Sequence, residues 1–115
     1  MANILEVILS AQEIRIWCKA NLPFYESVVC YDLVIFIAVR SLKNESITVK
    51  HVFDALPHSY TAIRQHYMRL ISDGWIVVIS DSPDQRIKHI KTTTKFDEII
   101  EEYARIHVSL TPEKF

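Results

Sequence analysis

The chain has 115 residues, of which 50% are hydrophobic and 23% are charged, and its formal net charge is −1 with an isoelectric point near 6.5. This length is enough for one domain with a real core. Because a near-neutral chain cannot displace counterions along nucleic acid indiscriminately, the composition excludes a protein that coats nucleic acid without selection. The positive charge is nevertheless concentrated, since residues 50–95 contain seven Lys or Arg against four Asp or Glu.

The cysteines, the N-terminus and the longest apolar run indicate in which cell compartment the protein works. The two cysteines, Cys18 and Cys30, lie in apolar helical segments rather than in a paired motif. This is typical of a reduced cytosolic protein, and a redox-sensing thiol is the less frequent alternative. The N-terminus lacks the positive start of a signal peptide, and the apolar run at 28–39 is too short to span a bilayer. We therefore expect a soluble, cytoplasmic protein that does not bind membranes.

Two long helices are predicted at the start of the chain. Residues 4–20 form a helix with a narrow polar stripe, and so much apolar circumference favours self-association over a monomer. After a break at 22–24, residues 25–43 are predicted as a central helix, although their β-branched side chains also fit a strand.

A helix-turn-helix is predicted next. Ser46 or Thr48 can cap a short helix that ends at Ala55. Lys50 and His51 lie off its apolar stripe and either touch phosphate or are solvated. The stripe itself consists of Val49, Val52, Phe53 and Leu56.

The second helix of this unit runs over residues 60–73 and is the candidate recognition helix. Ser59 can cap its start, and Gly74, the only glycine in the chain, follows its end. A left-handed C-cap explains that position, because only a residue without Cβ adopts it without strain. Its outward face carries the kinds of donors and acceptors that match base edges in the major groove: Thr61, Gln65 and Met68, flanked by Arg64 and Ala62.

A hairpin follows Gly74. Residues 75–79 are predicted as a strand, 81–85 as a turn and 86–91 as the returning strand. Arg86 can enter a narrow minor groove, and Lys88 would lie near phosphates. The order helix, turn, helix, hairpin is that of a winged helix.

These residues carry a family resemblance. The segment 70–76 resembles the end of the recognition helix and the first wing strand of the MarR family of bacterial transcriptional regulators. The segment 81–86, with Lys88, Ile90, Thr93 or Thr94 and Lys95 after it, is similar to that family's wing signature and to the threonine that opens its last helix. The resemblance implies dimerisation through the terminal helices and a small aromatic effector, for which Trp17, Tyr25 and Tyr31 are candidate lining residues.

The last predicted helix covers residues 96–107. Thr94 with Asp97 three positions later resembles a capping box. An apolar stripe follows at Phe96, Ile99, Ile100, Tyr103 and His107, while the glutamates between these positions face solvent. Residues 109–115 are predicted to fray or to dock on a partner subunit.

The predicted fold is therefore α+β and mainly α: one winged helix-turn-helix domain over residues 1–115. Residues 46–93 form the helix-turn-helix and wing, and residues 1–45 and 94–115 form helical core and dimerisation parts. The predicted function is sequence-specific regulation of transcription by a homodimer on double-stranded DNA, with recognition helix 59–73 in the major groove and wing 75–92 at the minor groove or backbone. The predicted DNA-binding residues are His58, Ser59, Tyr60, Thr61, Arg64, Gln65, Arg86 and Lys88.

No enzyme is predicted. The five histidines are scattered over different elements, and no catalytic motif, metal-ligand spacing or cofactor-binding glycine loop accompanies them. The competing class is a winged helix that binds protein and not DNA, since the fold alone does not separate the two.

Overall fold

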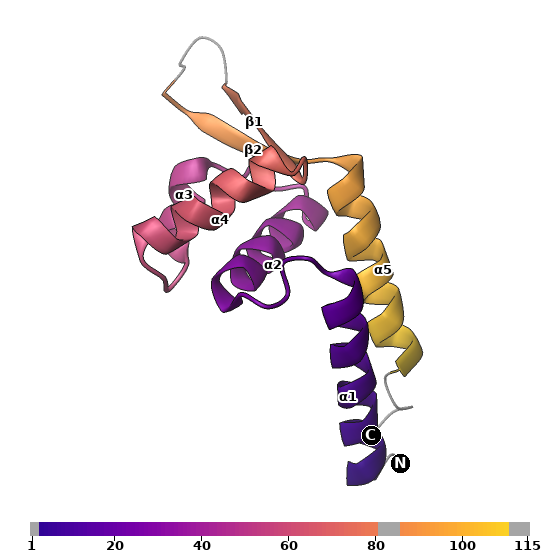
Figure 1. The fold of residues 1–115 in the computed structure, drawn as a ribbon. Helices are drawn as coiled ribbons and strands as arrows, with labels where there is room; N and C mark the ends of the chain where they lie inside the picture. The colour runs from indigo at the N-terminus through magenta and orange to yellow at the C-terminus, as the bar shows by residue number, and fades with distance from the viewer. Residues whose placement is uncertain (1–2, 81–85, 111–115) are drawn as a thin grey trace.

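The computed structural model describes residues 3–80 and 86–110, so the predicted turn at 81–85 lies outside the described residues. Helices α1 and α5 lie side by side and project away from a body formed by the other helices, with the hairpin at the far end (Figure 1). The molecule is correspondingly long, measuring 55 × 27 × 23 Å. The mainly helical α+β prediction is confirmed. In chain order the elements are α1 (Ile4–Asn21), α2 (Val28–Leu42), α3 (Val49–Ala55), α4 (Tyr60–Ser72), β1 (Ile76–Ser80), β2 (Lys88–Thr92) and α5 (Thr94–Leu110).

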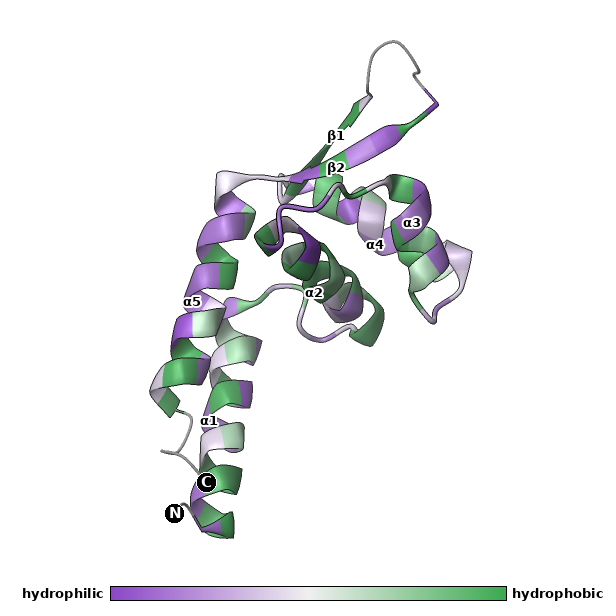
Figure 2. Cartoon of the chain, turned by 180° about the vertical axis from the view of Figure 1, so that it is seen from behind, coloured by the Kyte–Doolittle hydropathy of each residue, from purple (hydrophilic) through white to green (hydrophobic). Residues whose placement is uncertain are grey.

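The core is built around α2, the most uniformly apolar helix (Figure 2). Its β-branched residues form a helix because burial on several sides suits a central helix: Leu33 and Ile37 are 0% exposed, and Val34 is 1% exposed. The helix begins at Val28, three residues later than predicted, because the Ser27 hydroxyl accepts a hydrogen bond from the Cys30 N–H at 3.1 Å and caps it.

Hydroxyl caps also fix both helices of the helix-turn-helix. The Thr48 hydroxyl accepts from the His51 N–H at 3.2 Å and begins α3, so Thr48 and not Ser46 is the cap. The Ser59 hydroxyl accepts from the Ala62 N–H at 3.2 Å and begins α4, as predicted. Each cap satisfies an N–H that has no partner within its own helix.

Gly74 ends α4 in the left-handed conformation, with φ +78°. The Gly74 N–H donates to the Ile71 carbonyl at 3.1 Å, and the Trp75 N–H donates to the Leu70 carbonyl at 2.9 Å. This pair of bonds is the Schellman pattern, and it confirms the predicted cap. The chain therefore turns directly from α4 into the hairpin.

Replacing Gly74 by valine is expected to destabilise the domain by about 1–3 kcal/mol, because a β-branched residue would be held at positive φ. No atom lies within 4 Å of the position that a Cβ would occupy, so the cost is backbone strain and not a clash. Thermal denaturation measures it. Gly74→Asn is the control, since asparagine tolerates this conformation and should cost less. Equal midpoints for Gly74→Val and the wild type would contradict the left-handed cap.

The wing is larger than the predicted hairpin. Strands β1 and β2 pair antiparallel with Val78 opposite Ile90. On the other edge of β2, the Ile90 N–H donates to the Ile47 carbonyl at 2.8 Å, and Thr48 forms a bridge with His89. The segment before α3 thus pairs with β2 through one isolated β-bridge, which ties the wing to the helix-turn-helix.

Helix α5 is capped by Thr93, so the predicted capping box at Thr94 is wrong by one residue. The Thr93 hydroxyl accepts from the Phe96 N–H at 3.3 Å and lies 2.8 Å from the Gly74 carbonyl, to which it donates. The Thr93 hydroxyl also lies 3.0 Å from the Trp75 carbonyl, and these contacts favour a helix start at Thr94, the residue after Thr93. The Lys95 ammonium donates to the Asp73 carbonyl at 2.7 Å, which further joins α5 to the end of α4.

The free face of α1 is apolar. Within α1 only Cys18 is buried, and the helix leaves large apolar side chains in solvent. Among the described residues, none of the helices is long and apolar enough to cross a membrane. An apolar face of this size is a feature of a surface that another molecule covers. The exposed side chains on α1 are Ile4, Leu5, Ile8, Leu9 and Ile16.

Candidate nucleic-acid interface

Helix α4 divides its side chains as predicted. Ile63, Tyr67 and Leu70 are buried against the body, whereas Thr61 and Gln65 are exposed. The helix N-terminus, with its free N–H groups, lies at the same end as Ser59 and Tyr60. The exposed face therefore presents an amide, a hydroxyl and, on its flank, the Arg64 guanidinium.

A groove separates this helix from the wing. It has a volume of about 740 Å³, and α3, α4 and the start of the returning wing segment supply its walls. Four of the predicted DNA-binding residues line it together: Tyr60, Arg64, Arg86 and Lys88. Residues 26 positions apart in sequence thus converge on one surface, which the sequence order alone does not show.

The charge in the groove is strongly positive. Lys50, Arg64, Arg86 and Lys88 line it against one carboxylate, that of Asp54. A concave surface lined by one sign of charge concentrates its field and attracts a polyanion. The groove can therefore hold a phosphate-rich chain running between the helix and the hairpin.

The floor of the groove is aromatic. The Phe53 ring lies 4.9 Å from the Tyr60 ring and 5.4 Å, edge on, from the Tyr67 ring. These contacts hold Tyr60 in place although it is 64% exposed. Its phenol is therefore an oriented group at the mouth of the groove.

Two of the predicted DNA-binding residues, Ser59 and His58, make contacts within the protein. The Ser59 hydroxyl caps α4. His58 does not point outward: its Nε2 lies 2.7 Å from the Asp32 carboxylate on α2, and its side chain is 19% exposed. A histidine bound in this way anchors the turn before α4, so His58 is better described as a residue that positions the helix.

Lys50 is a groove residue that the sequence left undecided between phosphate contact and solvation. It lies in the first turn of α3 and lines the groove. Its neighbour His51 turns elsewhere, with Nε2 3.5 Å from an Arg40 nitrogen and its ring against Phe36. Two sequence features favour Lys50 as a phosphate contact: it lies off the apolar stripe of α3, and it is close to Thr48, which pairs with the wing.

The aromatic residues expected to line an effector pocket instead pack on one another. The Tyr25 and Tyr31 rings meet edge on at 5.6 Å, the Trp17 ring lies 6.5 Å from that of Tyr103, and the Tyr31 and Tyr103 hydroxyls share a hydrogen bond. Burial, followed by that hydrogen bond, raises the pKa of Tyr103. The cavity that Tyr31 and Tyr103 line has a volume of about 0 Å³, and neither Trp17 nor Tyr25 lines it.

Both cysteines are free and buried, Cys18 at 1% and Cys30 at 3% exposure. Burial raises the pKa of Cys18 and raises that of Cys30 to about 11. Because the thiolate is the reactive form, thiols in this state react slowly at neutral pH. Across residues 3–80 and 86–110, no three His, Cys, Asp or Glu side chains form a group that could hold a metal ion.

No protein-family model and no curated protein matches this sequence, but solved structures match its fold. S. aureus MepR bound to ethidium bromide is 14% identical, with a TM-score of 0.69 over 96% of this chain and 78% of that one. A mutant of E. coli MarR complexed with operator DNA is 21% identical, with a TM-score of 0.60 over 91% and 76%. The heme sensor PefR from Streptococcus agalactiae, in complex with heme, is 15% identical, with a TM-score of 0.59 over 100% and 83%. This chain has the winged-helix fold of the MarR-family transcription regulators.

Proposed function

We propose that this protein is a sequence-specific regulator of transcription that binds double-stranded DNA as a homodimer. In this proposal residues 46–93 read DNA, with α4 in the major groove and the wing at the minor groove or backbone. The observation that carries it is the groove in which Lys50, Arg64, Arg86 and Lys88 converge. The E. coli MarR structure of the same fold, which holds operator DNA, supports the same use of this surface.

The contacts divide by chemistry. Arg64 and Gln65 lie where side chains of α4 can reach base edges, Arg to guanine and Gln to adenine. Lys50 and Lys88, on opposite walls of the groove, suit the phosphate backbone. Arg86 begins the returning side of the wing and suits a narrow minor groove, where the negative potential is strongest.

A salt titration tests the proposal. Fluorescence anisotropy with a mixed-sequence duplex should give an affinity that falls steeply with salt, since cations that neutralise phosphates release counterions. Replacing Lys88 by alanine should weaken binding to every duplex alike and reduce the salt slope by about one unit. Lys19→Ala, on α1 and outside the groove, is the control and should leave the slope unchanged.

The competing function, protein binding without DNA, is favoured by one feature of the wing. Val77, Ile79 and Ile87 are 41–47% exposed and apolar. The same titration separates the two functions. If the wild type binds no duplex at low salt, the DNA proposal is wrong and the apolar wing becomes the candidate surface.

The dimer is proposed from the apolar outer face of α1 and the exposed end of α5, where Val108 is 78% exposed. In this proposal residues 1–45 and 94–115 form the dimer interface and support the DNA-binding part, residues 46–93. Two copies would place two α4 helices on successive turns of a duplex, which suits a two-fold symmetric site. A small aromatic effector, with Trp17, Tyr25 and Tyr31 as candidate lining residues, stays part of the proposal, and structures of the same fold that hold ethidium or heme support it.

Replacing Ile8 by glutamate is expected to convert a dimer into a monomer, because Ile8 is 59% exposed on the free face of α1 and a charge buried there would lack a partner. Sedimentation velocity at micromolar concentration measures this. The control is Val28→Glu, which introduces the same charge at an apolar residue of similar exposure, 70%, on the first turn of α2. A wild type that sediments as a monomer without DNA contradicts the proposed interface.

A further inference from the structure

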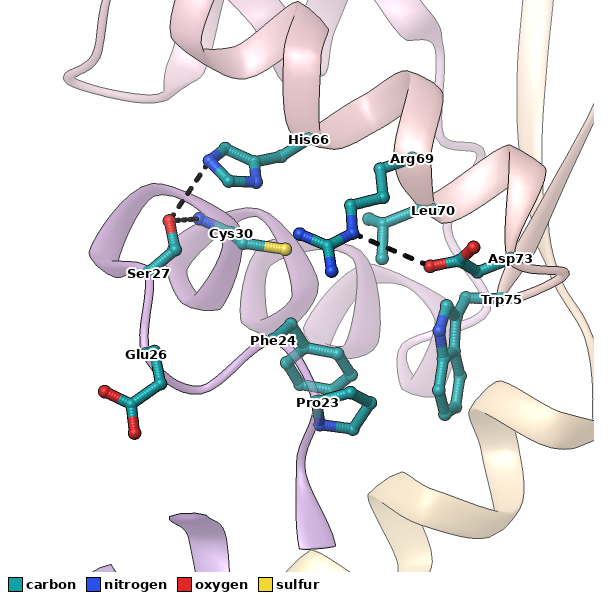
Figure 3. Close-up of a pocket in the computed structure, with 10 residues that line it drawn as sticks. All are labelled: Pro23, Phe24, Glu26, Ser27, Cys30, His66, Arg69, Leu70, Asp73 and Trp75. Atoms are coloured by element: carbon teal, nitrogen blue, oxygen red, sulfur yellow. Dashed lines mark hydrogen bonds and ion pairs between the residues drawn. The ribbon is translucent and has the colours of Figure 1, made fainter. Parts of the chain in front are cut away.

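Two histidines join the α4 region to the α2 region. His58 comes just before α4, and its Nε2–H donates to the Asp32 carboxylate at 2.7 Å. His66 lies in the middle of α4, and its Nε2 is 3.1 Å from the Ser27 hydroxyl at the start of α2, as the upper dashed line in Figure 3 shows. One helix and its cap therefore hold α4 at two separate points along its length.

The two contacts occur in opposite order along the two helices. The earlier histidine, His58, pairs with the later residue of the α2 region, Asp32, and His66 pairs with Ser27. A hydrogen bond needs a donor-to-acceptor distance near 3 Å and a nearly straight angle. A helix held by two such bonds cannot slide or rotate on its neighbour without breaking one of them.

The apolar packing between the same helices does not fix the position so closely. Cys30 on α2 and Leu70 on α4 are 3% and 2% exposed and line one cavity between the helices. Burial of apolar surface is favourable but has no preferred direction, so it tolerates small displacements. The two histidine contacts therefore select one orientation of α4 among several that would bury similar apolar surface.

Asp32 is the only acidic residue in the sequence of α2, whose other side chains are mostly apolar. Its side chain is 38% exposed and that of His58 is 19% exposed, so the pair is partly shielded from water. A hydrogen bond to a charged group is stronger than one between neutral groups, and shielding strengthens it further. The His58 N–H also donates to the Leu56 carbonyl at 2.9 Å, which holds the turn itself. The carboxylate thus fixes where α4 begins.

The orientation of α4 matters most for contacts to bases. Arg64 and Gln65 carry the proposed base contacts, and a hydrogen bond is lost when its two heavy atoms move apart to about 3.6 Å. A lysine is a point charge on a flexible stem and reaches phosphate from several positions. A displacement of α4 by about 1 Å would therefore remove base readout and leave the phosphate contacts in place.

We propose that two residues of the α2 region, Asp32 and Ser27, are positioning residues for DNA recognition. Acting through the two histidines, they set the orientation of α4 and with it the discrimination between a preferred site and other duplexes. Neither residue lines the groove between α4 and the wing, so neither acts by touching DNA there. The role in recognition rests on the proposed DNA-binding function, whereas the orientation of α4 on α2 does not.

The orientation is tested first without DNA, by residual dipolar couplings of the backbone amides in the full chain. Asp32→Ala is expected to change the couplings of residues 60–72 relative to those of residues 28–42. The matched control is Glu45→Ala, since Glu45 pairs with Arg40 of α2 at 3.6 Å and is 43% exposed against 38% for Asp32. This control should leave the relative couplings unchanged. Unchanged couplings in Asp32→Ala as well would overturn the proposal.

Discrimination is tested by anisotropy with a selected duplex and a scrambled one at one salt concentration. Asp32→Ala should lower the ratio of the two affinities at least about fivefold, the effect of losing one base contact, and change the affinity for the scrambled duplex less than about twofold. His58→Ala should do the same, and the double variant should be no worse than either, because the two residues act as one pair. His66→Ala tests the second contact, since Ser27 also caps α2.

Conservative variants separate positioning from a general loss of stability. Asp32→Asn keeps an acceptor oxygen and His58→Gln keeps an N–H donor near the Nε2 position, so each should keep the ratio within about twofold of the wild type. Equal loss on both duplexes, or an unchanged ratio in Asp32→Ala, overturns the positioning role. If the wild type binds no duplex, the proposed DNA function is wrong and the role in recognition falls with it, whereas the couplings still show whether Asp32 orients α4.

Discussion

Replacing Arg64 by alanine is expected to cost about 1–3 kcal/mol of binding free energy on a preferred DNA site and much less on a random duplex, so that sequence discrimination is lost first. Arg64 lies on the flank of α4 where the exposed helix face meets the positive groove. From there its guanidinium can reach a guanine edge with two parallel hydrogen bonds. Anisotropy with a selected site and a scrambled one, at the same salt concentration, measures the difference.

Gln65→Ala is expected to behave in the same way at a different base pair, because an amide reads adenine where a guanidinium reads guanine. The control is Asn21→Ala at the end of α1, which removes an exposed amide away from both the groove and the apolar face of α1. Equal loss on both duplexes for Arg64→Ala would mean that Arg64 touches phosphate and not bases. No loss on either would contradict the placement of α4 in the major groove.

Replacing Phe96 by alanine is expected to destabilise the fold by about 3–5 kcal/mol, the largest stability effect that we anticipate. Phe96 is 1% exposed and belongs to the core cluster at the start of α5. Its removal leaves a cavity where α5 joins the body. Urea denaturation at one fixed protein concentration measures the loss, since stability depends on concentration if the chain dimerises.

The control for Phe96 is Val28→Ala, which removes apolar atoms at a position that is 70% exposed and should change stability by less than about 0.5 kcal/mol. If Phe96→Ala costs no more than this control, α5 does not depend on its first turn for docking. The hydrogen bonds of Thr93 and Lys95 to the end of α4 would then carry the junction.

The two exposed faces of the molecule have different roles in this account. The groove between α4 and the wing is lined by cations and suits a polyanion, whereas the free face of α1 is apolar and suits a second copy of the chain. They lie toward opposite ends of a molecule 55 Å long (Figure 1). If two copies associate through α1, the groove between α4 and the wing therefore stays accessible in each copy.

The local signals were enough for most of the architecture. Hydroxyl residues before periodic segments located the start of α4 and narrowed that of α3 to two candidate caps, and the single glycine located the turn into the wing. These features are set by backbone hydrogen bonding within a few residues, so a sequence window contains them. The cap of α5 was not set by nearby residues. Both Thr93 and Thr94 suit a cap, and hydrogen bonds from the Thr93 hydroxyl to the Gly74 and Trp75 carbonyls, 19 and 18 residues earlier, favour Thr93.

By itself, then, the sequence determined the winged-helix order, the buried and exposed faces of α4, and the concentration of positive charge in residues 50–95. Only the tertiary structure decided which of those charged side chains line the same groove. It brings Lys50 to the groove with Arg86 and Lys88, and it turns His58 away to Asp32 at 2.7 Å. The reason is that helix periodicity and capping depend on neighbours along the chain. The residues that surround a charged side chain in space depend instead on how separate elements pack.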